Sequence, residues 1–547
     1  MKNYFSFLIL SCILFLKISY ANQIYFNAKV YTGDQQFAQA FVVSGGRFVY
    51  VGSNAGALAY KNSESVLSDL KFKTVIPGLI DSHIHAIRAG LTYKHEISLF
   101  GTKSISEALE RINIESKNLL PNQWIVIAGG WSELQFKEKR RFTLVELQSV
   151  SNGHPFYVQL NYSSVLLSND GLNKLSLKKN TDLLSSLQIE LLPNGAQSGW
   201  YMGSSRTISR LYDMLPKPSF SEQKRSSSLF FNELIKNGLT GVIDPGGYNL
   251  SLDSYSSIIQ LNDEKKLKLR VRYHICAPRY GTELEDFSSI IFKSKLVINT
   301  SKLKFNGIGE NVTWSMYNND DPSDKQKEYL LNLLLWAGSN NLPVTLHWNN
   351  DLSVKHLLEV LERVDSQHSV RSLRWSIAHL MDASSESLNT MSRLGIGWLV
   401  QNSFYFNGDR YIRQNGMDKA QSVPRIQLAL KNGVSIGAGT DAHRVMSYSP
   451  FISLQWLLDG KTIEGVQLGD AAQRPDRFEA LDLYTKGSAW FSFEEHERGQ
   501  IKVGFLADAV VLDRDYFTLP LDQIGSIKPL ATIIDGVLAF KNNLFLM

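Results

Sequence analysis

Cysteine is nearly absent from this chain of 547 residues, which contains only Cys12 and Cys276. Small secreted domains without a large core usually depend on several disulfides, so the chain is not of that class. The charge balance is also slight, because 57 Lys and Arg residues against 52 Asp and Glu residues give a formal net charge of +5. Nucleic-acid-binding domains usually carry a larger basic surplus, so we expect no nucleic-acid partner.

Long apolar runs are missing too, apart from a run of 12 residues at Phe5–Leu16. A membrane-spanning helix needs about 20 residues. Lys2 precedes the run, and Ser19-Tyr20-Ala21 places small residues at the −3 and −1 positions, which is the layout of a secretory signal peptide. We therefore expect residues 1–21 to be cleaved before Asn22, which leaves no stable membrane span. A retained membrane anchor is the alternative.

The expected mature chain keeps Cys276 alone and forms no internal disulfide. An export signal without disulfides favours a bacterial periplasmic or secreted enzyme over a eukaryotic extracellular one. With 44% hydrophobic residues, the chain can bury one large core and a smaller second domain. The sequence makes no prediction of the oligomeric state.

The middle of the chain alternates strand-like and helix-like segments. Strands are expected to start near Val75, Thr240, Leu269, Leu303, Val344, Trp375, Ile396 and Val434. From the second start onward the steps are 21 to 41 residues, the length of successive βα units. Eight such strands predict an α/β fold with a (β/α)8 TIM-like barrel. The long first gap predicts an insertion after strand 1, at about residues 86–238.

Both chain ends are rich in short β segments, among them Phe41–Val43 and Ala531–Ile534, the latter followed by the hairpin signal Asp535-Gly536. We therefore expect one small β-sandwich domain built from both termini, residues 22–74 and 491–547. The barrel and its insertion would occupy residues 75–490.

The strongest motif is Val75-Ile76-Pro77-Gly78-Leu79-Ile80-Asp81-Ser82-His83-Ile84-His85, an apolar strand that ends in two histidines. Side chains alternate along a strand, so His83, His85 and Asp81 point to the same face. Two imidazoles placed in this way can bind one transition-metal ion, and Zn²⁺ is the default for nitrogen and carboxylate ligands. Alone, the pair is also compatible with two inert polar residues.

Three further polar residues, His347, His379 and Asp441, each end an apolar strand-like run. Barrel enzymes place their catalytic groups at these C-terminal strand ends. Four histidines and an aspartate in register on strands one, five, six and eight predict a metal site. Other candidates are interpreted as core or loop residues: His274, Cys276 and His443.

Together with Gly439-Thr440-Asp441, these motifs resemble the metal-dependent amidohydrolase superfamily, in particular its N-substituted formamide deformylase-like branch. Gly129-Gly130-Trp131 matches a motif in the insertion of that branch. Residues 477–485 and 504–508 match its C-terminal motifs. The resemblance extends over nearly the whole mature chain.

The resemblance implies a role for each strand-end residue. His83 and His85 would hold a first metal ion, and His347 and His379 would hold a second if one is bound. Asp441 would touch the metal-bound water and serve as its general base. One or two Zn²⁺ ions, or another divalent metal, are therefore expected.

Many members also carry a strand-four lysine that is carboxylated to bridge two metals, and the resemblance puts Lys304 at that position, with Lys302 as a competing register. The chain departs from the family pattern after this lysine, where it reads Phe305-Asn306-Gly307-Ile308-Gly309-Glu310. It departs again at Trp348-Asn349-Asn350 and at Ser163, where a histidine is common. These departures bear on the number of metals and on the substrate.

The predicted function is that of an exported amidohydrolase, which cleaves an amide or N-formyl C–N bond of a small molecule with a metal-activated water and Asp441 as general base. The alternatives are a periplasmic metal- or ligand-binding protein that has lost catalysis, and a metal-dependent isomerase or esterase on the same scaffold. Four aromatic residues either contact the substrate or pack in the core: Trp131, Trp348, Phe404 and Tyr405.

Overall fold

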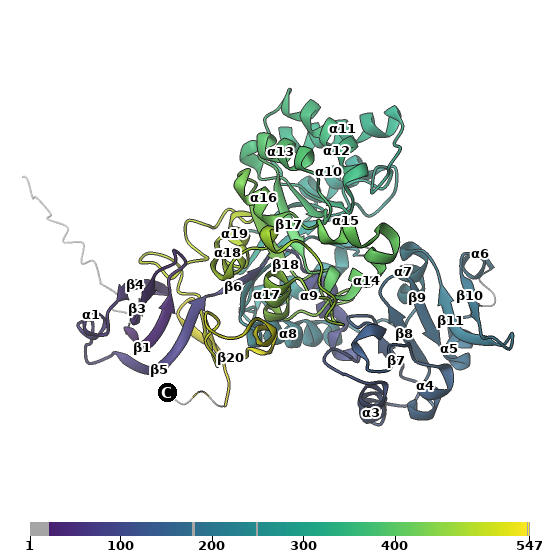
Figure 1. The fold of residues 1–547 in the computed structure, drawn as a ribbon, viewed down its shortest axis with the longest axis horizontal. Coiled ribbons are helices and arrows are strands. Elements are labelled where there is room, and N and C mark those ends of the chain that lie inside the picture. The colour runs from purple at the N-terminus through teal and green to yellow at the C-terminus, as the bar shows by residue number, and fades with distance from the viewer. Residues whose placement is uncertain (1–20, 178–180, 248–249, 544, 546–547) are drawn as a thin grey trace, which may run out of the picture.

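The computed structural model describes residues 21–177, 181–247, 250–543 and 545. Residues 1–20, nearly all of the expected signal peptide, lie outside this range. The described chain has three parts: a sheet built from both termini, a central part of parallel strands and helices, and a part made by the insertion (Figure 1). Within the described residues, no helix combines the length and the apolar character needed to cross a membrane.

The terminal sheet contains eight strands from both ends of the chain. From the N-terminus come β1 (Gln23–Tyr31), β2 (Phe37–Ala38), β3 (Ala40–Ser44), β4 (Arg47–Gly52) and β5 (Val66–Pro77), and from the C-terminus β19 (Ala509–Leu512), β20 (Pro529–Ile534) and β21 (Val537–Lys541). Their order is β21-β20-β19-β5-β1-β3-β4, with β2 paired to β1. Antiparallel pairing of β19 with β5 therefore joins the two ends in one sheet.

The central part contains eight parallel strands in two sheets of four. One sheet has the order β14-β13-β12-β6 and the other β15-β16-β17-β18. The strands are β6 (Leu79–Asp81), β12 (Leu239–Asp244), β13 (Arg270–Ile275), β14 (Leu303–Ile308), β15 (Thr345–Trp348), β16 (Ser376–His379), β17 (Gly397–Gln401) and β18 (Ile436–Gly439). Seven of them begin within two residues of the predicted positions.

The first predicted strand differs from the structure, because the segment from Val75 is divided at Gly78. Residues up to Pro77 belong to β5 of the terminal sheet, and β6 starts afresh at Leu79. Gly78 donates its N–H to the Asp508 carbonyl at 3.0 Å. A Cβ at Gly78 would lie 2.4 Å from Thr240 Oγ1, so only glycine fits where the chain crosses between the sheets.

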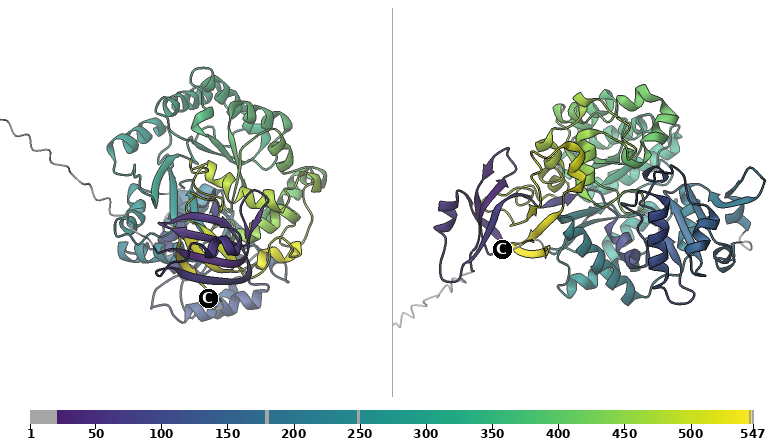
Figure 2. Two further views of the ribbon diagram at one scale, coloured as in Figure 1. Left: turned by 90° about the vertical axis from the view of Figure 1, so that its left-hand side faces the viewer. Right: turned by 60° about the horizontal axis from the view of Figure 1, so that its bottom comes forward.

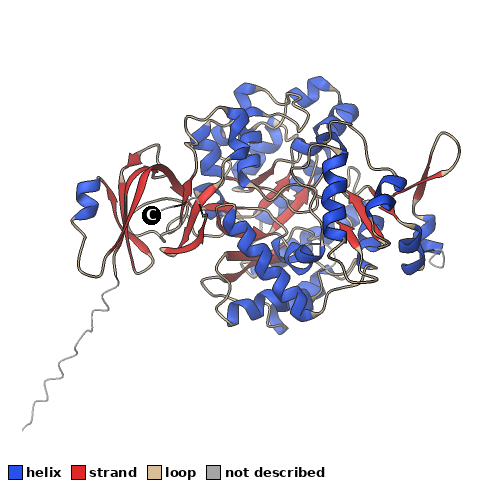
Figure 3. Cartoon of the chain, turned by 90° about the horizontal axis from the view of Figure 1, so that it is seen from below, coloured by secondary structure: helices blue, strands red, loops and turns tan. Residues whose placement is uncertain are grey.

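Hydrogen bonds connect the edges of the two parallel sheets. Ile308, at the end of β14, donates its N–H to the Pro343 carbonyl at 3.0 Å, and Ser82, just after β6, donates to the Ala438 carbonyl of β18 at 3.1 Å. The strands that precede the histidine and aspartate motifs therefore end near one another. Helices surround these strands (Figures 2 and 3).

Helices α12 (Asp351–Asp365) and α13 (Ser385–Leu394) illustrate how the sequence forms the outer layer. The Asn350 side chain caps α12 by accepting the Ser353 N–H at 2.9 Å. Apolar residues of α12 at helical spacing are buried in the main core, among them Val354, Leu357, Leu361 and Val364. In α13, Leu388, Met391 and Leu394 are buried at the same spacing.

The insertion forms a separate five-stranded mixed sheet with the order β10-β11-β9-β8-β7. The strands are β7 (Ile125–Ile127), β8 (Phe156–Leu160), β9 (Ser164–Leu167), β10 (Gln188–Leu191) and β11 (Gln197–Met202). Trp131, Phe136 and Phe142 pack in one of its two cores. Trp131 is fully buried there, which is the packing role left open for this residue.

A buried ion cluster connects the central strands to the C-terminal segment. The Glu494 carboxylate accepts hydrogen bonds from Arg272 Nη2 of β13 at 2.5 Å and from Arg498 Nη1 at 2.7 Å. All three side chains are nearly inaccessible to solvent. Burial raises the pKa of Glu494, but the two guanidinium groups lower it far more, so the net pKa lies well below its usual value.

We expect Glu494→Gln to lower the free energy of unfolding by about 3–5 kcal/mol, because it leaves the buried Arg272 guanidinium without a carboxylate. Arg498 keeps only its longer contact with Asp508, at 3.6 Å. A carboxylate with a lowered pKa stabilises the fold above its unfolded pKa of about 4.3, and this contribution disappears as the pH falls through the folded pKa. Urea unfolding at pH 7 measures the loss. Glu497→Gln is the matched control, since its exposed pair with Arg47 contributes about 1 kcal/mol or less. Equal losses in the two variants would contradict the account.

Candidate metal centre

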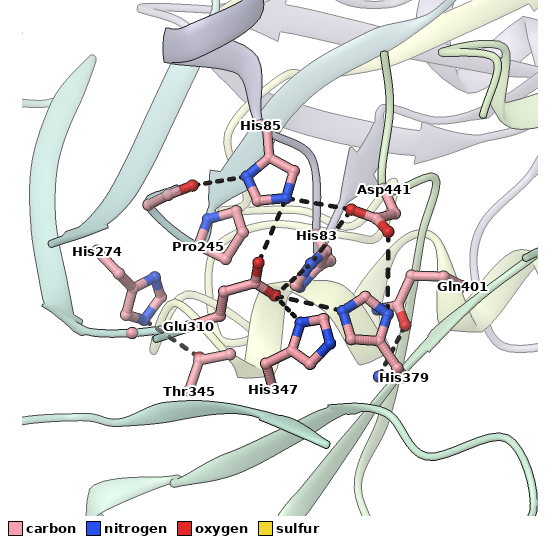
Figure 4. Close-up of polar contacts among 12 residues, drawn as sticks. His83, His85, Pro245, His274, Glu310, Thr345, His347, His379, Gln401 and Asp441 are labelled. Atoms are coloured by element: carbon pink, nitrogen blue, oxygen red, sulfur yellow. Dashed lines mark hydrogen bonds and ion pairs between the residues drawn. The ribbon is translucent and has the colours of Figure 1, made fainter. Parts of the chain in front are cut away.

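Five of the six predicted site residues converge at the C-terminal ends of the parallel strands. Two of them, His83 and His85, follow β6 directly; His347 lies in β15, His379 ends β16, and Asp441 follows β18 by two residues. Figure 4 shows the four imidazoles and the Asp441 carboxylate gathered around one further side chain, Glu310.

Glu310 is the centre of the cluster. Its Oε2 lies 3.0 Å from His347 Nδ1, 3.3 Å from His379 Nε2 and 3.3 Å from His83 Nε2. Its other oxygen, Oε1, lies 3.5 Å from His85 Nε2. One carboxylate therefore contacts all four histidines, three through Oε2 and one through Oε1 (Figure 4).

The assignment of Lys304 as the bridging ligand is corrected by this geometry. Lys304 is the second residue of β14, where it pairs in register with Arg272 of β13 and forms a bridge with Asn299 of the preceding loop. Glu310 follows the opposite end of the same strand. Six residues of extended chain span about 20 Å, so the two side chains lie at different ends of the sheet. The group that sequence reasoning missed is Glu310.

Asp441 closes the other side of the cluster. Its Oδ1 lies 3.2 Å from His85 Nε2 and 3.7 Å from His83 Nε2, and its Oδ2 lies 3.9 Å from His379 Nδ1. Asp441 and His379 both have positive φ, 55° and 73°. Non-glycine residues rarely adopt this conformation, and such strain collects at functional sites. Here it accompanies the turn of both side chains into the cluster.

The histidines keep both carboxylates ionised. Burial raises the pKa of Glu310, but His347, His379 and His83 lower it well below its usual value. Burial also raises the pKa of Asp441, and the hydrogen bond with His85 and the neighbouring imidazoles bring it below its usual value. Burial lowers the pKa of His83, which favours the neutral imidazole that binds metals.

The cluster fits a divalent cation. His83 is fully buried, yet neither of its ring nitrogens makes a hydrogen bond with correct geometry to a described residue, although Nε2 lies within ion-pair distance of Glu310. A buried imidazole without partners is costly, and a bound cation supplies the partner. Three groups of residues could each hold one metal ion, because the ligand atoms within each group lie within 4.8 Å of one another. The groups are His83, His85 and Glu310; Glu310, His347 and His379; and His83, His379 and Asp441.

Neighbouring side chains orient these ligands. Asp81 lies on the same strand but contacts Thr440 Oγ1 at 2.6 Å and the His83 N–H at 3.0 Å, so it connects the ends of β6 and β18 instead of joining the cluster. Gln401 accepts the His379 N–H at 2.9 Å, and Tyr317 Oη lies 2.8 Å from His347 Nε2.

The secondary candidates lie beside the cluster. His274 contacts the Asp244 carbonyl at 3.1 Å and is buried, and burial raises the pKa of Cys276 to about 12, so both behave as core residues. His443, expected to be a loop residue, donates a hydrogen bond from Nε2 to Glu96 Oε2 of the insertion at 2.6 Å. Burial raises the pKa of Glu96, but His443 and Arg444 lower it to about 2.

The Gly-Gly-Trp motif holds the loop after Asp441 in place. Gly130 donates its N–H to the Arg444 carbonyl at 2.6 Å. A Cβ at Gly129, whose φ is +125°, would lie 2.1 Å from the same oxygen. The motif therefore needs glycine because the loop after Asp441 packs directly on its backbone.

One of the remaining sequence departures lies in the insertion, and the other directly follows His347. Ser163 lines a cavity of about 650 Å³ in the insertion, and none of the residues that line this cavity belongs to the metal cluster. Trp348 and Phe404 are buried in the main core, and Tyr405 packs against it. The aromatic residues thus have packing roles.

The comparisons with known proteins agree with this site. The sequence profile of the amidohydrolase family matches residues 67–540. The chain is 22% identical over 545 residues to an N-substituted formamide deformylase from Arthrobacter pascens, covering 94% of this chain and 97% of that protein. It is 23% identical over 531 residues to Protein LONG AFTER FAR-RED 3 from Arabidopsis thaliana, covering 93% of this chain and 90% of that protein.

Among solved structures, a metal-dependent hydrolase from Pyrococcus horikoshii OT3 matches with a TM-score of 0.66 at 19% identity, over 92% of this chain and 99% of that one. This likeness shows a shared fold. The profile match shows that the chain belongs to the amidohydrolase family. It is therefore a metal-dependent hydrolase acting on carbon–nitrogen bonds other than peptide bonds, and the enzyme class predicted from the sequence is confirmed.

Proposed function

We propose that this enzyme is an exported amidohydrolase that cleaves an amide or N-formyl group of a small molecule, with Asp441 as its general base. One observation carries the proposal: two ionised carboxylates, Glu310 and Asp441, lie among four converging histidines. Glu310 contacts all four imidazoles, whereas Asp441 occupies the side of the cluster formed by His83, His85 and His379.

His83, His85 and Glu310 would hold one cation, and His347 and His379 with the same Glu310 would hold a second. Zn²⁺ is the first candidate, because imidazole and carboxylate are its usual ligands outside thiolate sites. A bound divalent cation supplies Lewis acidity, which polarises a carbonyl and lowers the pKa of water to about 7. Glu310 replaces Lys304 as the proposed shared ligand.

Asp441 performs the proton transfers. Its lowered pKa keeps the carboxylate ionised at neutral pH, so it can accept a proton from the attacking water. The same proton then passes to the leaving nitrogen as the C–N bond breaks. This delivery matters because an amide anion is a very poor leaving group. The products are a carboxylic acid, formate in the case of an N-formyl group, and an amine.

We also propose the architecture and location that accompany this function. The parallel strands would close into one (β/α)8 barrel within residues 75–490, supported by the hydrogen bonds between β14 and the segment before β15 and between β6 and β18. Residues 22–74 and 491–547 would form a β-sandwich domain, supported by their shared sheet. Export to the periplasm or medium rests on the sequence of residues 1–21.

A substrate screen tests the proposed activity. The mature chain, loaded with Zn²⁺, is incubated with N-formyl and N-acetyl amines of increasing size, and the released amine is measured. We expect hydrolysis that disappears after treatment with dipicolinate and returns when Zn²⁺ is added. Turnover of esters alone across the matched panel, with no amine released from any amide, would contradict the proposed reaction.

A further inference from the structure

The ligand histidines differ in what holds the ring nitrogen that faces away from the cluster. His85 directs Nε2 at the carboxylates of the site and donates its Nδ1–H to the Gly246 carbonyl at 2.6 Å. His347 directs Nδ1 at Glu310, at 3.0 Å, and its Nε2 lies 2.8 Å from the hydroxyl oxygen of Tyr317. Such outer partners fix the orientation and the tautomer of a metal-binding imidazole. For His85 the partner belongs to the main chain, whereas for His347 it is a side chain.

Tyr317 contacts His347 with its ring as well as with its hydroxyl group. The centroids of the two rings are 4.6 Å apart, and the ring planes are inclined by 38°. The side chain of His347 is 15% exposed, whereas that of His83 is 0% exposed. The surrounding core therefore restrains His347 less than His83, and the contact with Tyr317 limits the rotation of the His347 imidazole.

The loop that carries Tyr317 is itself anchored. It connects β14 to helix α11 (Asp324–Ser339). Three residues before Tyr317, Trp314 donates its N–H to Glu283 Oε1 at 3.1 Å and its indole N–H to the Ala277 carbonyl at 3.2 Å. Glu283 is buried, with 1% of the residue exposed. These bonds fix the backbone next to Tyr317, so its hydroxyl group is presented to His347 from a defined position.

The same loop joins the two stretches of sequence that depart from the family pattern. Glu310 lies in the first stretch and Asn349 in the second. Asn318, directly after Tyr317, accepts the Asn349 N–H on its Oδ1 at 2.8 Å, and the His347 N–H donates to the Glu310 carbonyl at 3.1 Å. The loop that supplies the shared carboxylate therefore also supplies the support for His347, so the two departures are structurally coupled.

We propose that Tyr317 is a positioning residue for the second cation. Its hydroxyl group holds the His347 imidazole with Nδ1 directed at the ion and thereby sets the affinity of the site formed by His347, His379 and Glu310. In this orientation Nε2–H donates to the phenol oxygen, and Nδ1 keeps its lone pair for the ion. The inference rests on the proposed two-cation arrangement and adds a residue that belongs to none of the three ligand groups.

Zn²⁺ titration of Tyr317→Phe tests the proposal. The substitution removes the hydroxyl group and keeps the ring that packs on His347. Wild-type and variant mature chains are stripped with dipicolinate and titrated with Zn²⁺ in competition with a chromogenic chelator, and the bound metal is counted by plasma mass spectrometry. At saturation the wild type should bind two equivalents. In Tyr317→Phe the affinity for the second equivalent should fall about 10- to 100-fold, the usual effect of losing an outer hydrogen bond to a ligand, while the first stays unchanged.

Tyr280→Phe is the matched control. It makes the same chemical change at a residue that is 67% exposed and should leave both Zn²⁺ affinities unchanged. A merely structural role of Tyr317 would disturb both sites together, because they share Glu310. Equal weakening of both equivalents in Tyr317→Phe would therefore overturn the positioning role.

The wild-type count distinguishes failure of this inference from failure of the proposed two-cation arrangement. Two equivalents in the wild type, with both affinities unchanged in Tyr317→Phe, would leave the arrangement standing and overturn the role of Tyr317. A single equivalent in the wild type would contradict the second site and the role of Tyr317 with it. A lower kcat in Tyr317→Phe at unchanged affinity for both ions would also overturn the proposal, because the hydroxyl group would then act on the substrate instead of His347.

Discussion

Asp441→Asn should lower kcat for amide hydrolysis by about 10²- to 10⁴-fold, the usual contribution of a positioned acid–base group. Asparagine has nearly the same shape as aspartate but cannot accept a proton at neutral pH. The four histidines and Glu310 remain, so the bound metal should remain as well. Steady-state kinetics and metal analysis of the same preparation measure the two effects together.

Asp418→Asn is the matched control for Asp441→Asn. Asp418→Asn makes the same chemical change at an exposed position in helix α15 (Met417–Gln421) and should leave kcat unchanged. If Asp441→Asn kept full activity, Asp441 could not be the general base. If it lost metal in proportion to activity, Asp441 would act chiefly as a ligand.

Glu310→Gln should weaken Zn²⁺ binding by more than about 100-fold. Loss of a side chain that only hydrogen-bonds to a metal ligand typically lowers the metal affinity about 10- to 100-fold. Glu310 contacts four histidines directly, so its loss should cost more. The neutral amide also removes the negative charge that lies between these imidazoles. Competition with a chromogenic chelator measures the affinity, and activity should fall with it.

Lys304→Met is the decisive comparison for Glu310. The lysine was the expected bridging ligand, but it lies at the opposite end of β14. We therefore expect Lys304→Met to keep both the metal content and the activity. Loss of metal in Lys304→Met, with normal binding in Glu310→Gln, would show that the lysine is the shared ligand and would contradict the geometry described above.

The strand-end histidines and Asp441 could be predicted because their signals are local. Each follows a short apolar strand, and parallel strands place such ends together. Another local signal, the Asp-Gly pair, located the hairpin at Asp535-Gly536, whose residues both have positive φ. The periodicity of apolar residues along the chain predicts where the strands lie, without any knowledge of tertiary contacts.

Glu310 was missed because the chain at the end of β14 is irregular. Gly307 and Gly309 have φ of 138° and 148°, and the register of β13 against β14 shifts between Tyr273 and His274. Simple alternation from Leu303 therefore does not say which side chain enters the site. The only signal was an acidic residue in the stretch that departs from the family pattern, two positions beyond the end of β14.

The measurement that tests the central claim most directly is the metal content of the mature protein, determined by plasma mass spectrometry after expression without a metal-binding tag. We predict one or two equivalents of Zn²⁺ per chain, with two equivalents supporting Glu310 as a shared ligand, and their loss in the His83→Ala/His85→Ala double variant. A folded protein that holds no divalent metal, even after reconstitution with Zn²⁺, would contradict the assignment of the cluster as a metal centre.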